Sequence, residues 1–173
     1  MQSTLILNAS FEPLNIVSGR RAIQLILNGK ATAVDNSPKT FKSVNGVIHV
    51  PYVIVLRKMA PHRHRKVGFS RRGVLVRDKF KCTYCPNDAT TIDHIVPQSL
   101  GGATSYENCV AACFKCNNKK SNKSLKAMGW TVPFTPGPPS PQQVFLHKCK
   151  RNGELWNVWL PHIEGRYGLS EHV

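Results

Sequence analysis

Four of the six cysteines form two pairs with the spacing Cys-x-x-Cys. The pairs are Cys82-Thr-Tyr-Cys85 and Cys113-Phe-Lys-Cys116, and 27 residues separate them. Each pair can present two sulfur atoms to one ion, and four thiolates suit tetrahedral Zn²⁺. Because a complete sulfur shell leaves no position for a substrate, we expect this zinc to be structural. Disulfides are disfavoured in a reducing compartment, and a redox Cys-x-x-Cys motif needs no second pair.

An acidic residue and a histidine are adjacent between the two cysteine pairs. They lie in the strand-like run Thr90-Thr-Ile-Asp-His-Ile-Val-Pro97. Neighbouring residues on a strand point to opposite sides. Asp93 can therefore bind a metal ion from one side while His94 reaches a water molecule near a phosphate. Histidine suits that task because its ordinary pKa lies nearest neutrality.

Amide and ammonium side chains follow the second cysteine pair in Asn117-Asn-Lys-Lys-Ser121. On a helix that begins near Cys113, Asn117, Lys120 and Ser121 share one face at spacings of three and four residues. An amide oxygen and an ammonium group would then lie near the same phosphate.

These motifs closely resemble the zinc-stapled HNH endonucleases, which have a ββα-metal core. The resemblance covers about residues 70–126 and rests on the order and spacing of Cys82-x-x-Cys85, Asp93-His94-Ile-Val-Pro97, Gly101-Gly102, Asn108 and Cys113-x-x-Cys116-Asn117-x-x-Lys120. The sequence departs from the family at Asn117, which replaces the last histidine. Similar HNN variants include the HNH domain of RNA-guided CRISPR nucleases.

The resemblance implies the roles of four residues. Asp93 and Asn117 would hold one Mg²⁺ or Mn²⁺ ion, for which oxygen ligands are suited, and the ion would stabilise the pentavalent phosphate and the leaving 3′ oxygen. His94 would act as general base on the attacking water. Asn108 would orient the loop that bears the histidine. The implied fold class is α+β, with a small treble-clef-like ββα-metal core.

Positive charge is concentrated directly before the first cysteine pair. The net charge is +15, and residues 57–81 contain ten Lys or Arg and one Asp. Such a local excess attracts a polyanion, and we expect DNA, with RNA not excluded. A role in solubility alone is the alternative, but it does not require clustering beside a metal site. The residues expected to contact nucleic acid are Arg63, Arg65, Arg71, Arg72, Arg77, Lys119 and Lys120.

The rest of the chain is expected to form appendages to this core. Residues 1–60 predict a small α+β unit, with strands at 5–7, 14–17, 31–34, 47–50 and 53–56 and a helix from Ser18 to Leu27. Residues 61–129 contain the basic connection and the HNH core, with a short helix capped by Ser70. Residues 130–173 comprise a proline-rich linker and a helical tail that packs on the core. Cys109 and Cys149 lie outside the pairs and are expected to be buried.

Several other classes are excluded or left as alternatives. The chain has no apolar run of about 20 residues and no secretory signal at its start, so we expect a cytoplasmic protein, bacterial or phage-encoded. A zinc deaminase needs His-x-Glu and a zinc protease needs His-Glu-x-x-His, and both motifs are absent. A non-catalytic zinc module that binds nucleic acid, and a degenerate HNH core that docks a partner, stay open. One ββα-metal site cuts one strand at a time, so a homodimer is also possible.

Overall fold

The chain divides into two compact units, each of which is described by itself. The computed structural model describes residues 2–43, 46–61, 66–151 and 156. Unit 1 comprises residues 1–64 and 145–173, and unit 2 comprises residues 65–144. No helix in these described ranges is long and apolar enough to cross a membrane.

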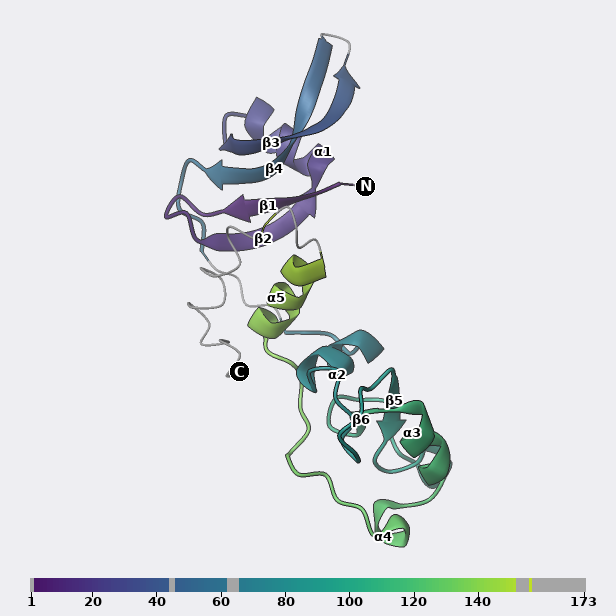
Figure 1. Cartoon of the computed structure of the whole chain (residues 1–173). Coiled ribbons are helices and arrows are strands. Elements are labelled where there is room, and N and C mark those ends of the chain that lie inside the picture. The colour runs from purple at the N-terminus through teal and green to yellow at the C-terminus, as the bar shows by residue number, and fades with distance from the viewer. Residues whose placement is uncertain (1, 44–45, 62–65, 152–155, 157–173) are drawn as a thin grey trace. The chain divides into compact units, whose positions relative to one another are not determined.

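Unit 1 is built on a four-stranded mixed sheet (Figure 1). Its strands, in spatial order, are β2 (Pro13–Ser18), β1 (Ser3–Leu7), β4 (Gly46–Leu56) and β3 (Ala31–Ser43). β1 pairs antiparallel with β2 and parallel with β4, and β3 pairs antiparallel with β4. The predicted strands are confirmed in place, but the last two form one continuous β4, and the strand predicted at 31–34 continues to Ser43 in β3. The strand runs through Pro51, whose carbonyl accepts a hydrogen bond of 2.7 Å from the Thr4 hydroxyl.

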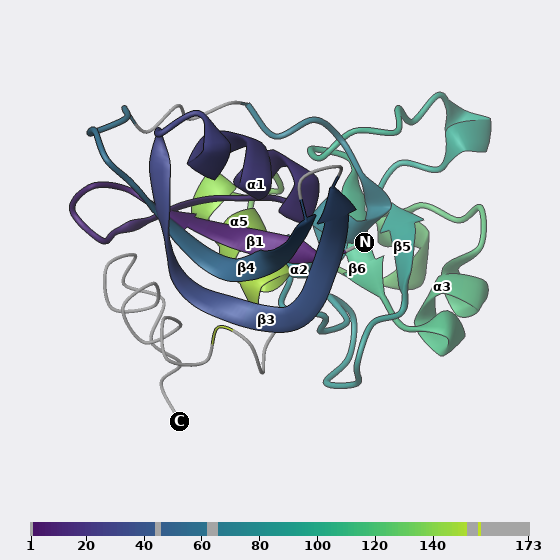
Figure 2. The same ribbon diagram turned by 90° about the horizontal axis from the view of Figure 1, so that it is seen from above.

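One face of this sheet is covered by α1 (Gly19–Leu27), as Figure 2 shows. Ser18 caps the helix as predicted, because its side chain accepts a hydrogen bond from the backbone N–H of Arg21. Successive strand residues point to opposite faces. Ile6 and Ile54 accordingly pack on the α1 side with Ala22.

The opposite face of the sheet is covered by the chain's C-terminal region. Leu5, Leu7 and Val53 form one buried cluster with three residues that come after the proline-rich segment, Leu146, Cys149 and Trp156. The first two belong to α5 (Pro141–Arg151), and the Trp156 indole N–H donates to the carbonyl of Tyr52. The tail was predicted to pack on the core at 61–129, but its described residues from 145 onward belong to unit 1. The rest of the predicted helical tail, residues 152–155 and 157–173, lies outside the described residues.

Unit 2 contains the predicted ββα arrangement. Strands β5 (Thr91–His94) and β6 (Cys109–Ala112) pair antiparallel, and α3 (Phe114–Lys120) follows directly. The other elements are α2 (Arg71–Arg77), the 3-10 helix η1 (Gln98–Leu100) and α4 (Leu125–Met128). Ser70 caps α2 as predicted. Each unit contains a sheet with helices packed on it, and unit 2 has the ββα order. These features confirm the α+β class.

The proline-rich segment 131–140 has no helix or strand, as its composition predicts. It lies against unit 2 through Arg77, whose guanidinium donates to the carbonyl of Gly137 and lies 5.5 Å from the centre of the Phe134 ring.

Candidate metal and catalytic site

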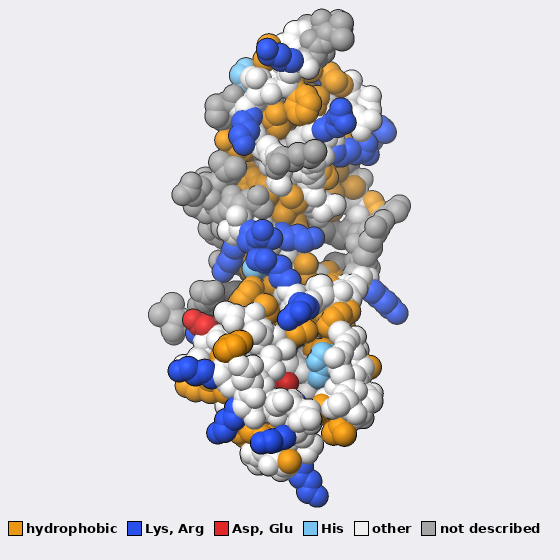
Figure 3. Space-filling model, turned by 90° about the vertical axis from the view of Figure 1, so that its right-hand side faces the viewer, with side chains coloured by type: hydrophobic (Ala, Val, Ile, Leu, Met, Phe, Trp, Pro, Cys, Tyr) orange, Lys and Arg blue, Asp and Glu red, His pale blue; other side chains and the backbone are white. Residues whose placement is uncertain are grey.

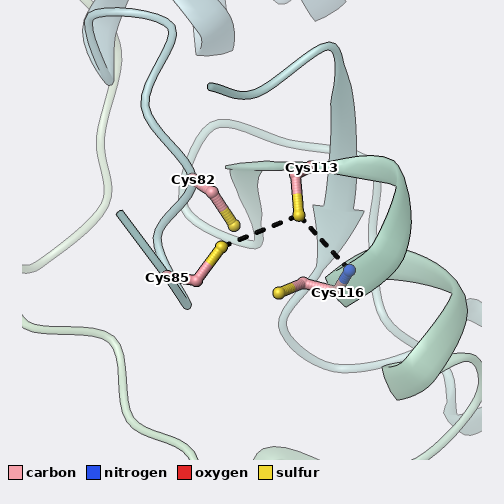
Figure 4. Close-up of side chains that lie close together, drawn as sticks. All are labelled: Cys82, Cys85, Cys113 and Cys116. Atoms are coloured by element: carbon pink, nitrogen blue, oxygen red, sulfur yellow. Dashed lines mark hydrogen bonds between the residues drawn. The ribbon is translucent and has the colours of Figure 1, made fainter. Parts of the chain in front are cut away.

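The four paired cysteines converge in unit 2. Their sulfur atoms all lie within 4.8 Å of one another and turn toward a common point, as Figure 4 shows. The Sγ atoms of Cys85 and Cys113 are 3.7 Å apart. Four sulfurs bound to one zinc at its usual bond length would lie about 3.8 Å apart. The cluster could therefore hold a metal ion such as zinc. It is the one group of three or more Cys, His, Asp or Glu side chains in the described chain that could do so.

Local backbone geometry brings the two pairs together. After α2 the chain reverses through Lys79 and Phe80, both with positive φ, and the N–H of Cys82 bonds to the carbonyl of Asn87. The first pair is tied to β6 because the Thr83 N–H donates to Ala111. In the second pair Cys113 is the N-cap of α3, and its sulfur accepts from the N–H of Cys116. The turn after α2 therefore presents the sulfurs of Cys82 and Cys85, and the start of α3 presents those of Cys113 and Cys116.

The thiols of the cluster differ in acidity. The backbone N–H of Cys116 is the main cause that lowers the pKa of Cys113 to about 7. Desolvation raises the pKa of Cys82 and of Cys116 above the ordinary thiol value. Binding of a metal ion by the cluster would therefore displace protons from Cys82 and Cys116, which would make metal affinity dependent on pH.

The carboxylate of Asp93 is buried and held on both oxygens. Its side chain is 5 % exposed. The Tyr84 hydroxyl donates to Oδ2 at 2.6 Å. The Lys120 ammonium lies 3.1 Å from each of the two carboxylate oxygens. Burial, followed by the bond to Asp93, raises the pKa of Tyr84 well above its ordinary value, so the phenol keeps its proton and is the donor.

The position of Lys120 shows that its predicted role was wrong. It was expected to contact a phosphate, but it is fully buried, and its ammonium also donates to the backbone carbonyl of His94 at 2.6 Å. Its positive charge is thus directed at Asp93 and at the strand that bears the histidine. Ser121, expected on the same helix face, instead follows α3 with positive φ.

We expect Lys120→Met to lower the free energy of unfolding by about 3–5 kcal/mol, because it leaves the buried Asp93 charge without its partner. Urea unfolding followed by circular dichroism measures this value. Lys123→Met is the matched control, since Lys123 is exposed and follows the same helix. Equal losses in the two variants would contradict a stabilising ion pair.

His94 lies on the other side of β5 from Asp93, as strand alternation predicts. Its Nε2 atom is 2.9 Å from the hydroxyl of Thr104, and the ring is partly exposed. Thr104 also accepts from the side chain of Gln98. Figure 3 shows, in its lower part, a histidine side chain and an acidic side chain on one face of unit 2, with Lys and Arg side chains scattered around them.

Asn108 holds the loop that follows His94. Its side-chain oxygen accepts from the N–H of Val96, and its amide nitrogen donates to the carbonyls of Val96 and Ala103. Gly102 permits this close packing, since a Cβ atom there would overlap the Val96 carbonyl oxygen. Asn108 therefore fits a positioning role rather than direct contact with a substrate.

Asn117 projects from α3 toward β5. Its amide nitrogen donates to the Thr91 hydroxyl at 3.0 Å and to the carbonyl of Ile92 at 3.1 Å. With the nitrogen so engaged, the side-chain oxygen is directed away from these two acceptors. It is the atom that a cation would bind.

Besides Lys120, the basic side chains predicted to contact nucleic acid divide into three groups. Arg71, Arg72 and Lys119 are exposed on unit 2. Arg63 and Arg65 lie outside the described residues. Arg77 corrects a prediction, because its side chain is 10 % exposed and donates to Asp78 and to the carbonyls of Tyr106, Gly137 and Cys109. Arg77 therefore holds unit 2 together and is not free to contact a phosphate.

Two residues next to the site were not anticipated from the sequence. Tyr84 contacts Asp93 and Thr104 contacts His94. A tyrosine inside a cysteine pair and a threonine in a loop are common and carry no signal by themselves.

Comparison with protein families gives two matches. Residues 82–123 match the HNH endonuclease model, and residues 4–64 match the model described as HNH endonuclease-associated, N-terminal domain. The first span contains the four paired cysteines, β5, β6 and α3, and the second covers the sheet and α1 of unit 1. No protein among the curated sequences matches the chain.

Proposed function

Because the chain belongs to the HNH endonuclease family, we propose that it hydrolyses phosphodiester bonds in DNA at Asp93, His94 and Asn117. The observation that carries the proposal is the placement of these three side chains. One strand presents Asp93 and His94 on opposite sides, and α3 directs Asn117 at the same strand.

The four-cysteine cluster is proposed as a structural zinc site. All four ligand positions are filled by sulfur, which leaves none for a substrate. It fixes the start of α3 against the chain before β5, and so determines where Asn117 and Lys120 meet the strand.

Asp93 and Asn117 are proposed to hold a second, exchangeable cation, Mg²⁺ or Mn²⁺. The donor set fits, because a carboxylate and an amide oxygen are the ligands that hard cations prefer. A divalent ion there would supply charge neutralisation to the phosphate and to the leaving oxygen. Each carboxylate oxygen has more than one lone pair, so the bonds from Tyr84 and Lys120 do not exhaust Asp93 as a ligand.

His94 is proposed to remove a proton from the attacking water. Thr104 and the loop held by Asn108 fix the position of its ring. The exposed Lys and Arg of unit 2 are proposed to attract the DNA backbone; they include Lys66, Arg71, Arg72, Lys115 and Lys119.

A non-catalytic zinc module that binds nucleic acid would share the cysteines and the basic surface. It would have no use for a buried carboxylate beside a histidine. Incubation of the purified, zinc-loaded protein with supercoiled plasmid separates the two functions. We expect nicked circles with Mg²⁺ or Mn²⁺ and none with EDTA. Plasmid that is retarded but never nicked, with either ion, would support the binding module instead.

A further inference from the structure

Tyr84 connects the zinc cluster to the carboxylate of the proposed catalytic site. It stands between Cys82 and Cys85, so the two neighbouring thiols fix its backbone once they bind a metal. Its hydroxyl reaches across nine residues of chain to Oδ2 of Asp93 at 2.6 Å. This is one of the shortest side-chain bonds in the described part of unit 2.

The Tyr84 ring is itself held in place. It stacks on Trp130, with ring centres 4.7 Å apart and an angle of 29° between the planes. The Lys119 ammonium lies 5.9 Å from the centre of the Trp130 ring. The phenol is therefore fixed from two directions, by the cysteine pair along the chain and by an aromatic partner from beyond α4.

Lys120 alone would not set the direction of the carboxylate. Its ammonium is equally distant from both oxygens, so the ion pair fixes where Asp93 lies more than how its plane is rotated. The Tyr84 bond is made to one oxygen only. It distinguishes Oδ2, which the phenol and the ammonium both approach, from Oδ1, which the ammonium approaches. Oδ1 therefore keeps a lone-pair direction for another partner.

We propose that Tyr84 is a positioning residue that orients Asp93 for the catalytic cation and so couples the structural cysteine cluster to the cutting site. The inference rests on the proposed function, since it takes Asp93 as a ligand. Carboxylates that bind metals are commonly fixed by an outer hydrogen bond, and loss of such a partner typically weakens metal affinity or activity by about 10- to 100-fold.

The test compares Tyr84→Phe with Tyr106→Phe. Each change removes one hydroxyl from unit 2, but the Tyr106 hydroxyl donates to the carbonyl of Gly68 and not to Asp93. Mn²⁺ binding to zinc-loaded protein is measured by electron paramagnetic resonance of the free ion, without DNA. The half-saturating Mn²⁺ concentration for plasmid nicking is measured in parallel, and Asp93→Asn gives the reference for loss of the ligand.

We expect Tyr84→Phe to bind Mn²⁺ about tenfold more weakly than wild type and to need a correspondingly higher Mn²⁺ concentration for nicking. Tyr106→Phe should bind Mn²⁺ as wild type does, even if its melting temperature falls. A Tyr84→Phe protein with wild-type Mn²⁺ affinity and metal dependence would overturn the coupling while leaving the nuclease intact. A wild-type protein that neither binds Mn²⁺ nor nicks would overturn the proposed function and, with it, this inference.

Discussion

Cys113→Ser is expected to lose zinc and to unfold unit 2. Cys113 is central to the cluster, because its sulfur lies 3.7 Å from that of Cys85 and caps α3 through the N–H of Cys116. Structural zinc in small domains contributes about 10–16 kcal/mol of apparent binding free energy, which becomes folding free energy. The hydrophobic cluster around the site is small and consists largely of alanine and cysteine, so it cannot replace that contribution.

Zinc content by atomic absorption and thermal unfolding by calorimetry measure the two effects. Wild type should carry about one zinc per chain, and Cys113→Ser close to none. Cys109→Ser is the matched control, since Cys109 is fully buried in the same unit but is not one of the four clustered cysteines. It should keep its zinc despite some loss of stability. Wild-type zinc content and melting temperature in Cys113→Ser would contradict a structural zinc site at these cysteines.

The cluster and its helix could be predicted from the sequence because their chemistry is local. Two Cys-x-x-Cys pairs have few uses other than a metal site. The spacing of the residues after Cys113 is enough to predict that a helix begins there. The alternation of β5 likewise predicts that Asp93 and His94 point apart. Asn108 was predicted to orient the loop only through the resemblance, and the structure shows the bonds by which it can do so.

The partners of long side chains could not be predicted in the same way. Helical spacing places Lys120 and Asn117 on one face of α3, but it does not reveal that a buried carboxylate lies opposite the ammonium. Arg77 looks like part of a basic surface in the sequence. Only the fold shows three carbonyl groups converging on its guanidinium.

The packing partner of the C-terminal tail could not be predicted from the sequence either. The apolar residues of α5 and Trp156 predict a buried face, but periodicity does not specify which sheet or helix that face contacts. The structure pairs it with Leu5, Leu7 and Val53, which come from the opposite end of the chain. A proline-rich segment separates the two regions in sequence and gives no indication of this contact.

His94→Ala is expected to lower the rate of DNA nicking by about 10²- to 10⁴-fold, the usual contribution of a general base. The side chain is partly exposed and, by the structure, bonds through Nε2 to Thr104. Its removal therefore leaves the Asp93 ion pair, the cysteine cluster and the exposed basic residues in place. The melting temperature and the affinity for DNA should stay close to the wild-type values.

The most direct test of the account is the single-turnover rate of plasmid nicking by wild type and His94→Ala, with protein in excess and Mg²⁺ present. His49→Ala, an equivalent substitution of an exposed histidine in unit 1, serves as the control. We expect wild type and His49→Ala to nick at similar rates, and His94→Ala to bind the plasmid but to nick it at least about 100-fold more slowly. Equal rates for wild type and His94→Ala would contradict the account.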